Sequence, residues 1–159
     1  MAERAEILSQ DDLAPDFELI TDTGGKLSRA GLKGRPFVLY FYPKDDTSGC
    51  TREAMDFSAA LPKFEKLGVA VLGVSKDSLE THAKFRKKHK LKHALGSDPD
   101  IETATAYGVW IEKSMYGRKY MGMERATFLI DGKGVIKEAW HKVKVPGHVE
   151  AVLAAAKKL

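Results

Sequence analysis

The chain has 159 residues, of which 43% are hydrophobic and 30% charged, and its formal net charge is +4. This length and composition predict one globular domain, residues 1–159, with a buried core. The longest apolar stretch lies within residues 36–43 and is too short to span a bilayer. The N-terminus lacks a signal-peptide core, and a single cysteine excludes an internal disulfide. We therefore expect a cytoplasmic protein with no membrane contact.

The first half of the chain predicts a strand–helix–strand unit. Residues 15–20 alternate apolar and polar side chains and predict a strand, which pairs with residues 26–28 in an N-terminal β-hairpin. Residues 36–42 are continuously apolar, as in a buried central strand. Residues 49–67 repeat apolar side chains at helical spacing, and an internal proline is expected to kink this helix or divide it in two. Residues 69–74 predict a second, parallel strand.

Further helices follow the second strand. A helix begins at Asp77 or Ser78 and extends to about residue 90. Asp98-Pro99 predicts a third helix with the proline at its first position. An apolar stripe after Pro146-Gly147 predicts the last helix.

Residues 125–131 and 135–141 flank an Asp-Gly-Lys-Gly turn and predict a β-hairpin before the last helix. The elements together predict an α/β fold, with a central mixed β-sheet flanked by helices on both faces. This order, with a cysteine at the first helix, resembles the thioredoxin-like arrangement.

Cys50, the only cysteine, lies where the central strand turns into the first helix. The free N–H groups of a first helical turn, which here begins at Gly49, and the positive end of the helix dipole favour a thiolate. A thiolate is the nucleophile that cleaves a peroxide O–O bond. The alternative is a structural role as a small buried hydrophobic residue.

Two further residues of this segment suit peroxide chemistry. The hydroxyl of Thr47 can orient a peroxide, and Pro43 can shield the pocket without adding an N–H group. Each has a structural alternative, since Thr47 can simply cap the helix and Pro43 can simply end the strand. A cation for the leaving oxygen has to come from elsewhere in the chain.

The spacing Pro43-x-x-x-Thr47-x-x-Cys50 resembles the active-site signature of the peroxiredoxins. Residues 40–54 resemble the peroxiredoxin Q subfamily, also called bacterioferritin comigratory protein. Residues 14–17, 73–77 and 124–131 resemble other parts of that subfamily, so the resemblance extends from about residue 11 to residue 153.

The resemblance implies a thiol-dependent peroxidase without a bound cofactor or metal, acting on hydrogen peroxide and organic hydroperoxides. It implies that Cys50 is the peroxidatic cysteine, which passes through a sulfenic acid, and that Thr47 orients the peroxide. It also implies that Arg125 is the missing cation, although the residues alone favour an ordinary surface arginine. Glu53 either holds this arginine or favours the first helical turn.

The chain departs from the subfamily at two kinds of position. Ser48 stands where the family commonly has proline. Met55 occupies one of the two places of a resolving cysteine, and the helix from Ser78 to Lys90, which includes Thr81 and Arg86, offers none. The resemblance then implies a one-cysteine cycle, in which thioredoxin, glutaredoxin or glutathione reduces Cys50. An intermolecular disulfide between two Cys50 residues is the other option.

Other interpretations remain open. The same cysteine could serve a peroxide sensor or redox-relay binding protein. The basic run 84–92 is better explained as a solvated helix face than as a nucleic-acid site. Residues 113–122 predict a basic, aromatic loop that either lines the reductant or substrate surface or merely packs. None of the five histidines shows metal spacing, and the subfamily resemblance suggests a monomer.

Overall fold

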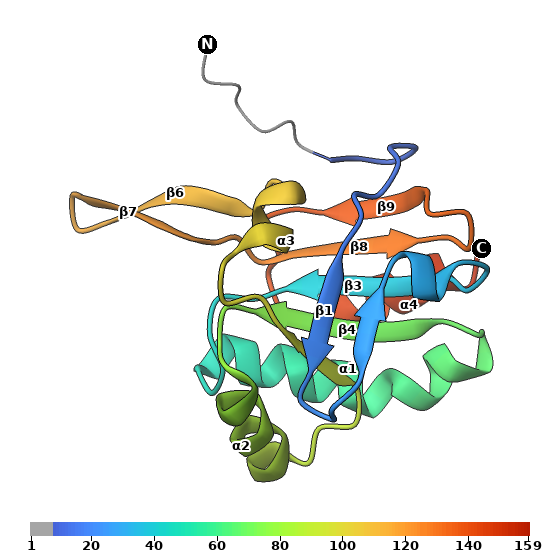
Figure 1. The fold of residues 1–159 in the computed structure, drawn as a ribbon, viewed down its shortest axis with the longest axis horizontal. Coiled ribbons are helices and arrows are strands. Elements are labelled where there is room, and N and C mark those ends of the chain that lie inside the picture. The colour runs from blue at the N-terminus through green and yellow to red at the C-terminus, as the bar shows by residue number, and fades with distance from the viewer. Residues whose placement is uncertain (1–7) are drawn as a thin grey trace.

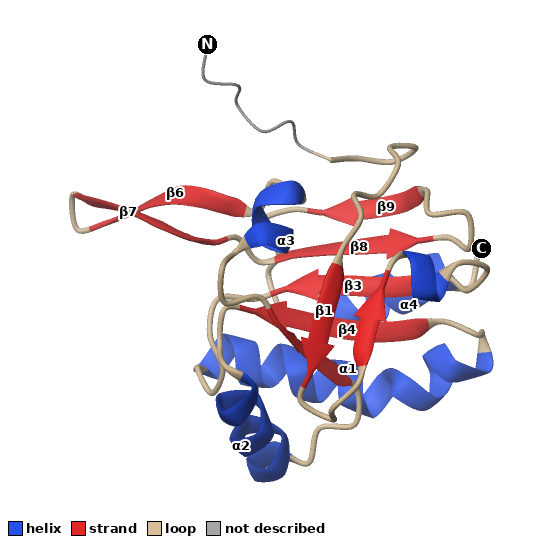
Figure 2. Cartoon of the chain, viewed as in Figure 1, coloured by secondary structure: helices blue, strands red, loops and turns tan. Residues whose placement is uncertain are grey.

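Seven strands form one mixed β-sheet in the computed structural model, which describes residues 8–159 (Figures 1 and 2). The strand order is β2-β1-β5-β4-β3-β8-β9, with β3, β4 and β5 parallel to one another. The strands are β1 (Glu18–Thr21), β2 (Lys26–Ser28), β3 (Phe37–Phe41), β4 (Ala70–Ser75), β5 (Ala94–Ser97), β8 (Ala126–Ile130) and β9 (Ile136–Trp140).

Helices cover both faces of this sheet (Figure 2). They are α1 (Ser48–Lys66), α2 (Leu79–His89), α3 (Glu102–Ala106) and α4 (His148–Ala156), with a 3-10 turn at Ala30–Leu32. Side chains of β3 alternate between two cores, as expected for a strand buried on both faces. Val38 and Tyr40 pack with α1, α2 and α4, whereas Leu39 and Phe41 pack with α3. The predicted fold class is confirmed.

The unit β3–α1–β4 positions the first turn of α1 at the carboxyl edge of the parallel strands. Tyr40 of β3 lies opposite Gly73 of β4. A Cβ atom at Gly73 would lie 2.6 Å from the ring of Tyr40, so only glycine leaves room for this ring. Tyr40 in turn stacks on Phe57 of α1, with ring centroids 4.4 Å apart. These contacts fix α1 against the sheet.

Most of the predicted elements are present at the expected places. The N-terminal hairpin, the central strand, the second strand and the β8–β9 hairpin all form. Ser78 caps α2 by accepting a hydrogen bond from the backbone N–H of Thr81. The internal proline was predicted to kink the first helix or divide it. Division is wrong, because α1 continues through Pro62, whereas a kink stays a prediction.

The third helix begins later than predicted. Asp98 and Pro99 lie in a turn, closed by the N–H of Ile101 donating to the carbonyl of Asp98 (3.0 Å), and α3 starts at Glu102. The carboxylate of Asp98 reaches past this turn and accepts bonds from the N–H groups of Thr103 and Ala104 (3.2 and 2.8 Å). Asp98 therefore caps the helix from a distance, and Pro99 is not its first residue.

The segment predicted as a loop at residues 113–122 is instead part of a β-hairpin. Strands β6 (Trp110–Met115) and β7 (Arg118–Met123) pair antiparallel and project away from the main sheet (Figure 1). Tyr116 and Gly117 both have positive φ values, 52° and 77°, which suit a two-residue hairpin turn. No helix within the described residues is both long and apolar enough to cross a membrane.

Candidate active site

Cys50 is the third residue of α1, and its side chain is buried, at 1% exposure. The turn after β3 feeds directly into the helix, and the N–H of Thr51 donates to the carbonyl of Thr47 (2.8 Å) as the helix begins. The thiol therefore lies within the first helical turn, where backbone N–H groups remain available.

Arg125 brings a cation to this thiol from 75 residues further along the chain. It directly precedes β8, whose first residue, Ala126, pairs with Phe41 at the end of β3. This antiparallel register places Arg125 beside the turn that leads to Cys50. Its Nη2 donates to Cys50 Sγ (3.3 Å), and its Nη1 donates to Glu53 Oε1 (2.7 Å).

Glu53 lies one helical turn after Cys50, and its side chain is fully buried. Burial raises the pKa of its carboxyl to about 7, although the charge and hydrogen bond of Arg125 oppose this shift. Its second oxygen, Oε2, has no hydrogen-bond partner among the described protein atoms. Glu53 thus forms a buried ion pair with the guanidinium of Arg125, and its role at the site stays a prediction.

Gly49 allows the arginine to come this close. A Cβ atom at this position would lie 3.2 Å from Nη2 of Arg125, tighter than ordinary van der Waals contact. The absence of a side chain at Gly49 leaves space for the guanidinium beside the sulfur. The structure thus brings together Cys50, Gly49, Glu53 and Arg125.

Thr47 and Pro43 lie on the turn that leads into the site. Thr47 has the backbone conformation of a helix N-cap, but its side chain does not cap the helix. Its hydroxyl instead donates to the carbonyl oxygen of Lys44 (2.9 Å) and is exposed. Pro43 is half-buried just after β3. Both residues precede Cys50 by a few positions in the chain. The hydrogen bond of the Thr47 hydroxyl goes to Lys44 and not to the sulfur of Cys50.

Sequence reasoning did not single out two residues near this site. Tyr40 is buried, and its pKa is raised well above its ordinary value, first by burial and then by Glu53 and Cys50. Burial, followed by the charge of Arg125, lowers the pKa of Lys113 in β6, while Cys50 opposes this shift. The stem of Lys113 lies over Gly122, across the hairpin. The sequence signals were the place of Tyr40 at the start of the segment that resembles the subfamily and, for Lys113, the basic, aromatic composition of the hairpin segment.

A buried polar cluster lies under the turn. Asp45, Asp77 and His82 offer ligand atoms within 4.8 Å of one another, a spacing that a metal ion could use. These atoms already bond to each other or to neighbours, since Asp45 accepts from Tyr42 (2.6 Å) and Asp77 accepts from Ser75 (2.6 Å). The arrangement is that of a hydrogen-bond network.

The positions that depart from the subfamily pattern differ in environment. Ser48 is the exposed first residue of α1, and Met55 is 47% exposed. Arg86 is not part of a solvated basic face, because its guanidinium pairs with the buried carboxylate of Asp22. The same guanidinium donates to the carbonyl oxygens of Leu91 (2.6 Å) and His93 (2.5 Å), in the segment that connects α2 to β5.

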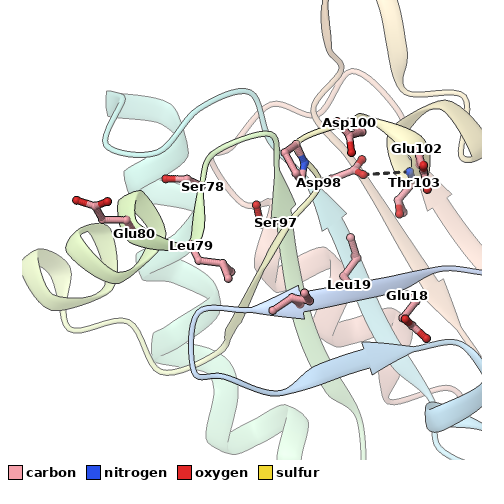
Figure 3. A pocket seen from close by; sticks show the side chains of 12 residues that line it. Glu18, Leu19, Ser78, Leu79, Glu80, Ser97, Asp98, Asp100, Glu102 and Thr103 are labelled. Atoms are coloured by element: carbon pink, nitrogen blue, oxygen red, sulfur yellow. Dashed lines mark hydrogen bonds between the residues drawn. The ribbon is translucent and has the colours of Figure 1, made fainter.

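The side chains drawn in Figure 3 line a cavity of about 560 Å³. Leu19 and Ile20 of β1, Leu79 of α2 and the Asp98–Thr103 segment line it. None of the candidate site residues contributes to its wall. The cavity is therefore separate from the candidate site residues.

Comparison with known proteins agrees with the geometry. The AhpC/TSA family matches residues 11–139. The chain belongs to this family. Peroxiredoxin Bcp of Bacillus subtilis is 46% identical over 146 residues, 92% of this chain and 93% of its own. Peroxiredoxin Bcp of Xanthomonas campestris is 46% identical over 142 residues, 89% of each chain.

Solved structures extend this agreement to three dimensions. Xanthomonas campestris peroxiredoxin Q superimposes with a TM-score of 0.85 at 45% identity, covering 89% of this chain and 90% of the other. A structure of the bacterioferritin comigratory protein from the same organism, described by its alkyl peroxide reduction activity, is 44% identical, with a TM-score of 0.85 and the same coverage. The chain is thus a peroxiredoxin of the Q type, and its relatives support a peroxide-reducing oxidoreductase.

Proposed function

We propose that the chain is a thiol peroxidase in which Cys50 attacks hydrogen peroxide and organic hydroperoxides. The observation that carries this is the 3.3 Å bond from Arg125 Nη2 to the sulfur of a cysteine in a first helical turn. A guanidinium donor and free backbone N–H groups stabilise a thiolate and then the negative charge on the leaving oxygen. The alkyl peroxide reduction activity of the X. campestris relative supports organic hydroperoxides as substrates.

In the first step the thiolate of Cys50 attacks the terminal oxygen of the peroxide. The S–O bond forms as the O–O bond breaks, so sulfur is oxidised to a sulfenic acid and the leaving oxygen takes up a proton as water or alcohol. The proton of the Thr47 hydroxyl is engaged by the carbonyl of Lys44 (2.9 Å), so its lone pairs can accept the peroxide O–H. Pro43 shields the pocket without a competing N–H group.

An external thiol completes the cycle. Met55 occupies one position where many subfamily members carry a resolving cysteine, and the following helix, which includes Thr81 and Arg86, offers none, so Cys50 has no internal partner. The external thiol attacks the sulfenic sulfur and releases water, and a second thiol reduces the mixed disulfide. Thioredoxin, glutaredoxin and glutathione are the reductants proposed, in a monomer of one domain, residues 1–159, in the cytoplasm.

The second candidate function is a peroxide sensor or redox relay that passes oxidation from Cys50 to a partner thiol. Burial of Cys50 and the lack of a resolving cysteine favour it. Steady-state peroxide consumption with each of the three reductants separates the two functions. Sustained turnover with at least one of them is expected for the peroxidase. Oxidation that stops after one equivalent of peroxide with all three would favour the sensor.

A further inference from the structure

Asp45 lies in the turn between β3 and α1, and its side chain is fully buried. Its Oδ1 accepts a hydrogen bond from the hydroxyl of Tyr42 (2.6 Å), and its Oδ2 lies 2.6 Å from Nδ1 of His82 in α2. Its backbone N–H donates to Oδ2 of Asp77 (2.8 Å). The turn that carries the proposed site is thus tied from beneath to α2 and to the end of β4.

His82 uses both ring nitrogens in this network. Its Nε2 lies 2.9 Å from the carbonyl oxygen of Gly96 in β5, and a carbonyl can only accept, so Nε2 carries a hydrogen. Its Nδ1 faces a carboxylate oxygen of Asp45. Two lone pairs would repel at this distance, so a proton lies between these atoms, and the raised pKa of His82 beside Asp45 assigns it to the ring. Both nitrogens then donate, and the ring is an imidazolium.

The surroundings favour this charge state. Burial is the largest single influence and would lower the pKa of His82, but the hydrogen bond and charge of Asp45, together with Gly96 and Asp77, outweigh it and raise the pKa. Tyr42 keeps its proton as a donor, because burial, with Tyr40 and Asp45, raises its pKa well above the ordinary value. Within the described residues, Asp45 and Asp77 are the charged groups shown to act on His82, from the turn and from the β4–α2 connection.

The turn needs support, because its next residue is held in a disfavoured conformation. Asp46 has a φ of 60°, which a residue other than glycine rarely adopts. Lys88 and His89 of α2 bind its carboxylate at 2.8 and 2.9 Å on the exposed side. Residues of α2 therefore bind the turn on two sides, at the exposed Asp46 and at the buried Asp45.

We propose that the Asp45–His82 ion pair is a positioning device for the peroxide site, in which the imidazolium of His82 holds the buried carboxylate and so fixes the turn that carries Thr47 and Cys50. This inference rests on the proposed function, since the site that the pair positions is the one at Cys50. When Nδ1 loses its proton, its lone pair faces Oδ2 of the buried Asp45, which leaves these two atoms unsatisfied and loosens the turn.

The charge state is tested first, on the reduced wild-type protein. Long-range ¹H–¹⁵N correlation NMR reports the protonation of both ring nitrogens, and His82→Gln assigns the signal. At pH 7 we expect both nitrogens of His82 to show imidazolium shifts. A neutral ring, with one protonated nitrogen, would overturn the proposal. This result does not depend on peroxide reduction, so failure of the ion pair is distinguishable from failure of the proposed function.

The positioning role is tested by the peroxide reaction rate as a function of pH. His82→Gln and, as a second variant, Asp45→Asn are expected to slow the reaction about tenfold at pH 6. The difference from wild type should shrink as the pH rises and His82 loses its charge. Ser78→Ala removes the cap of α2 without touching the ion pair, and its rate should follow wild type at every pH. A pH-independent loss in His82→Gln, or no loss at pH 6, would overturn the positioning role.

Discussion

The guanidinium of Arg125 lies against Gly49, where a Cβ atom would come within 3.2 Å of Nη2. The same nitrogen donates to Cys50 Sγ, while Nη1 binds the buried Glu53. The approach of the Arg125 guanidinium to the sulfur therefore depends on the missing side chain of Gly49 and on the buried carboxylate of Glu53. Each of these contacts can be changed separately.

Gly49→Ala is expected to slow the reaction with peroxide about tenfold, because the added methyl group shifts the guanidinium by a few tenths of an ångström. Alanine is the better helix former, so thermal stability should not fall. Gly25→Ala is the matched control, since its Cβ would meet only Thr21 Oγ1 at an ordinary 3.9 Å. Stopped-flow kinetics checks this, and equal rates for both variants and wild type would show that the contact is not needed.

Arg125→Lys is expected to reduce the peroxide rate constant by about 10²-fold. A lysine ammonium cannot reach the sulfur and Glu53 with two fixed nitrogens as a guanidinium does. Arg125→Met should be as slow or slower. Rate constants measured under pseudo-first-order conditions check this prediction, and a lysine variant within twofold of wild type would remove the assigned role of Arg125.

Glu53 should make the stability of the protein fall as the pH rises towards neutrality. Its pKa is about 7 in the fold, above its ordinary value of 4.5. The contribution of the Glu53 carboxyl to the stability of the fold is therefore fully present below about pH 4.5 and is lost as the pH rises through 7. Relative to wild type, Glu53→Gln should gain stability between pH 5 and pH 8, by on the order of 2 kcal/mol. Urea unfolding at each pH measures this, with the exposed Glu65→Gln of the same helix as control; parallel pH profiles for Glu53→Gln and wild type would contradict it.

Arg86→Met is expected to destabilise the protein by about 3 kcal/mol, because it leaves the buried carboxylate of Asp22 without its cation. Lys84→Met, in the same helix, removes only an exposed pair with Glu80 and should cost less than about 1 kcal/mol. Denaturant unfolding compares the two. Equal costs would mean that Arg86 is an ordinary surface residue despite its contacts.

The sequence predicted the elements that local patterns specify. A continuous apolar run marks β3, helical spacing marks α1 and α4, and a turn of glycines marks the β8–β9 hairpin. Strand β5 carries no such signal, because Ala94–Ser97 is short and contains glycine. It forms because β4 and β1 offer partners on its two sides. Tertiary pairing, which local pattern cannot show, determines this part of the fold.

The same distinction applies to the candidate site. Thr47, Gly49 and Cys50 are neighbours in the chain, so a single segment suggests them together. Arg125 is 75 residues away from Cys50, and the residues alone favoured a surface role until the family resemblance was considered. Asp45 lies within the segment that resembles the subfamily, but no motif links it to His82, 37 residues away, so only the packing of α2 on the turn shows that they pair.

The most direct measurement is the single-turnover rate at which the reduced protein consumes hydrogen peroxide, with a sulfenic-acid trap and mass spectrometry to locate the oxidised residue. Full ionisation of an ordinary thiol at pH 7 gains only about thirtyfold in rate. A built peroxidase site predicts a rate well beyond that gain, with the label on Cys50 and no reaction in Cys50→Ser. A rate near that of a free thiol, or equal consumption by Cys50→Ser, would contradict the proposed function.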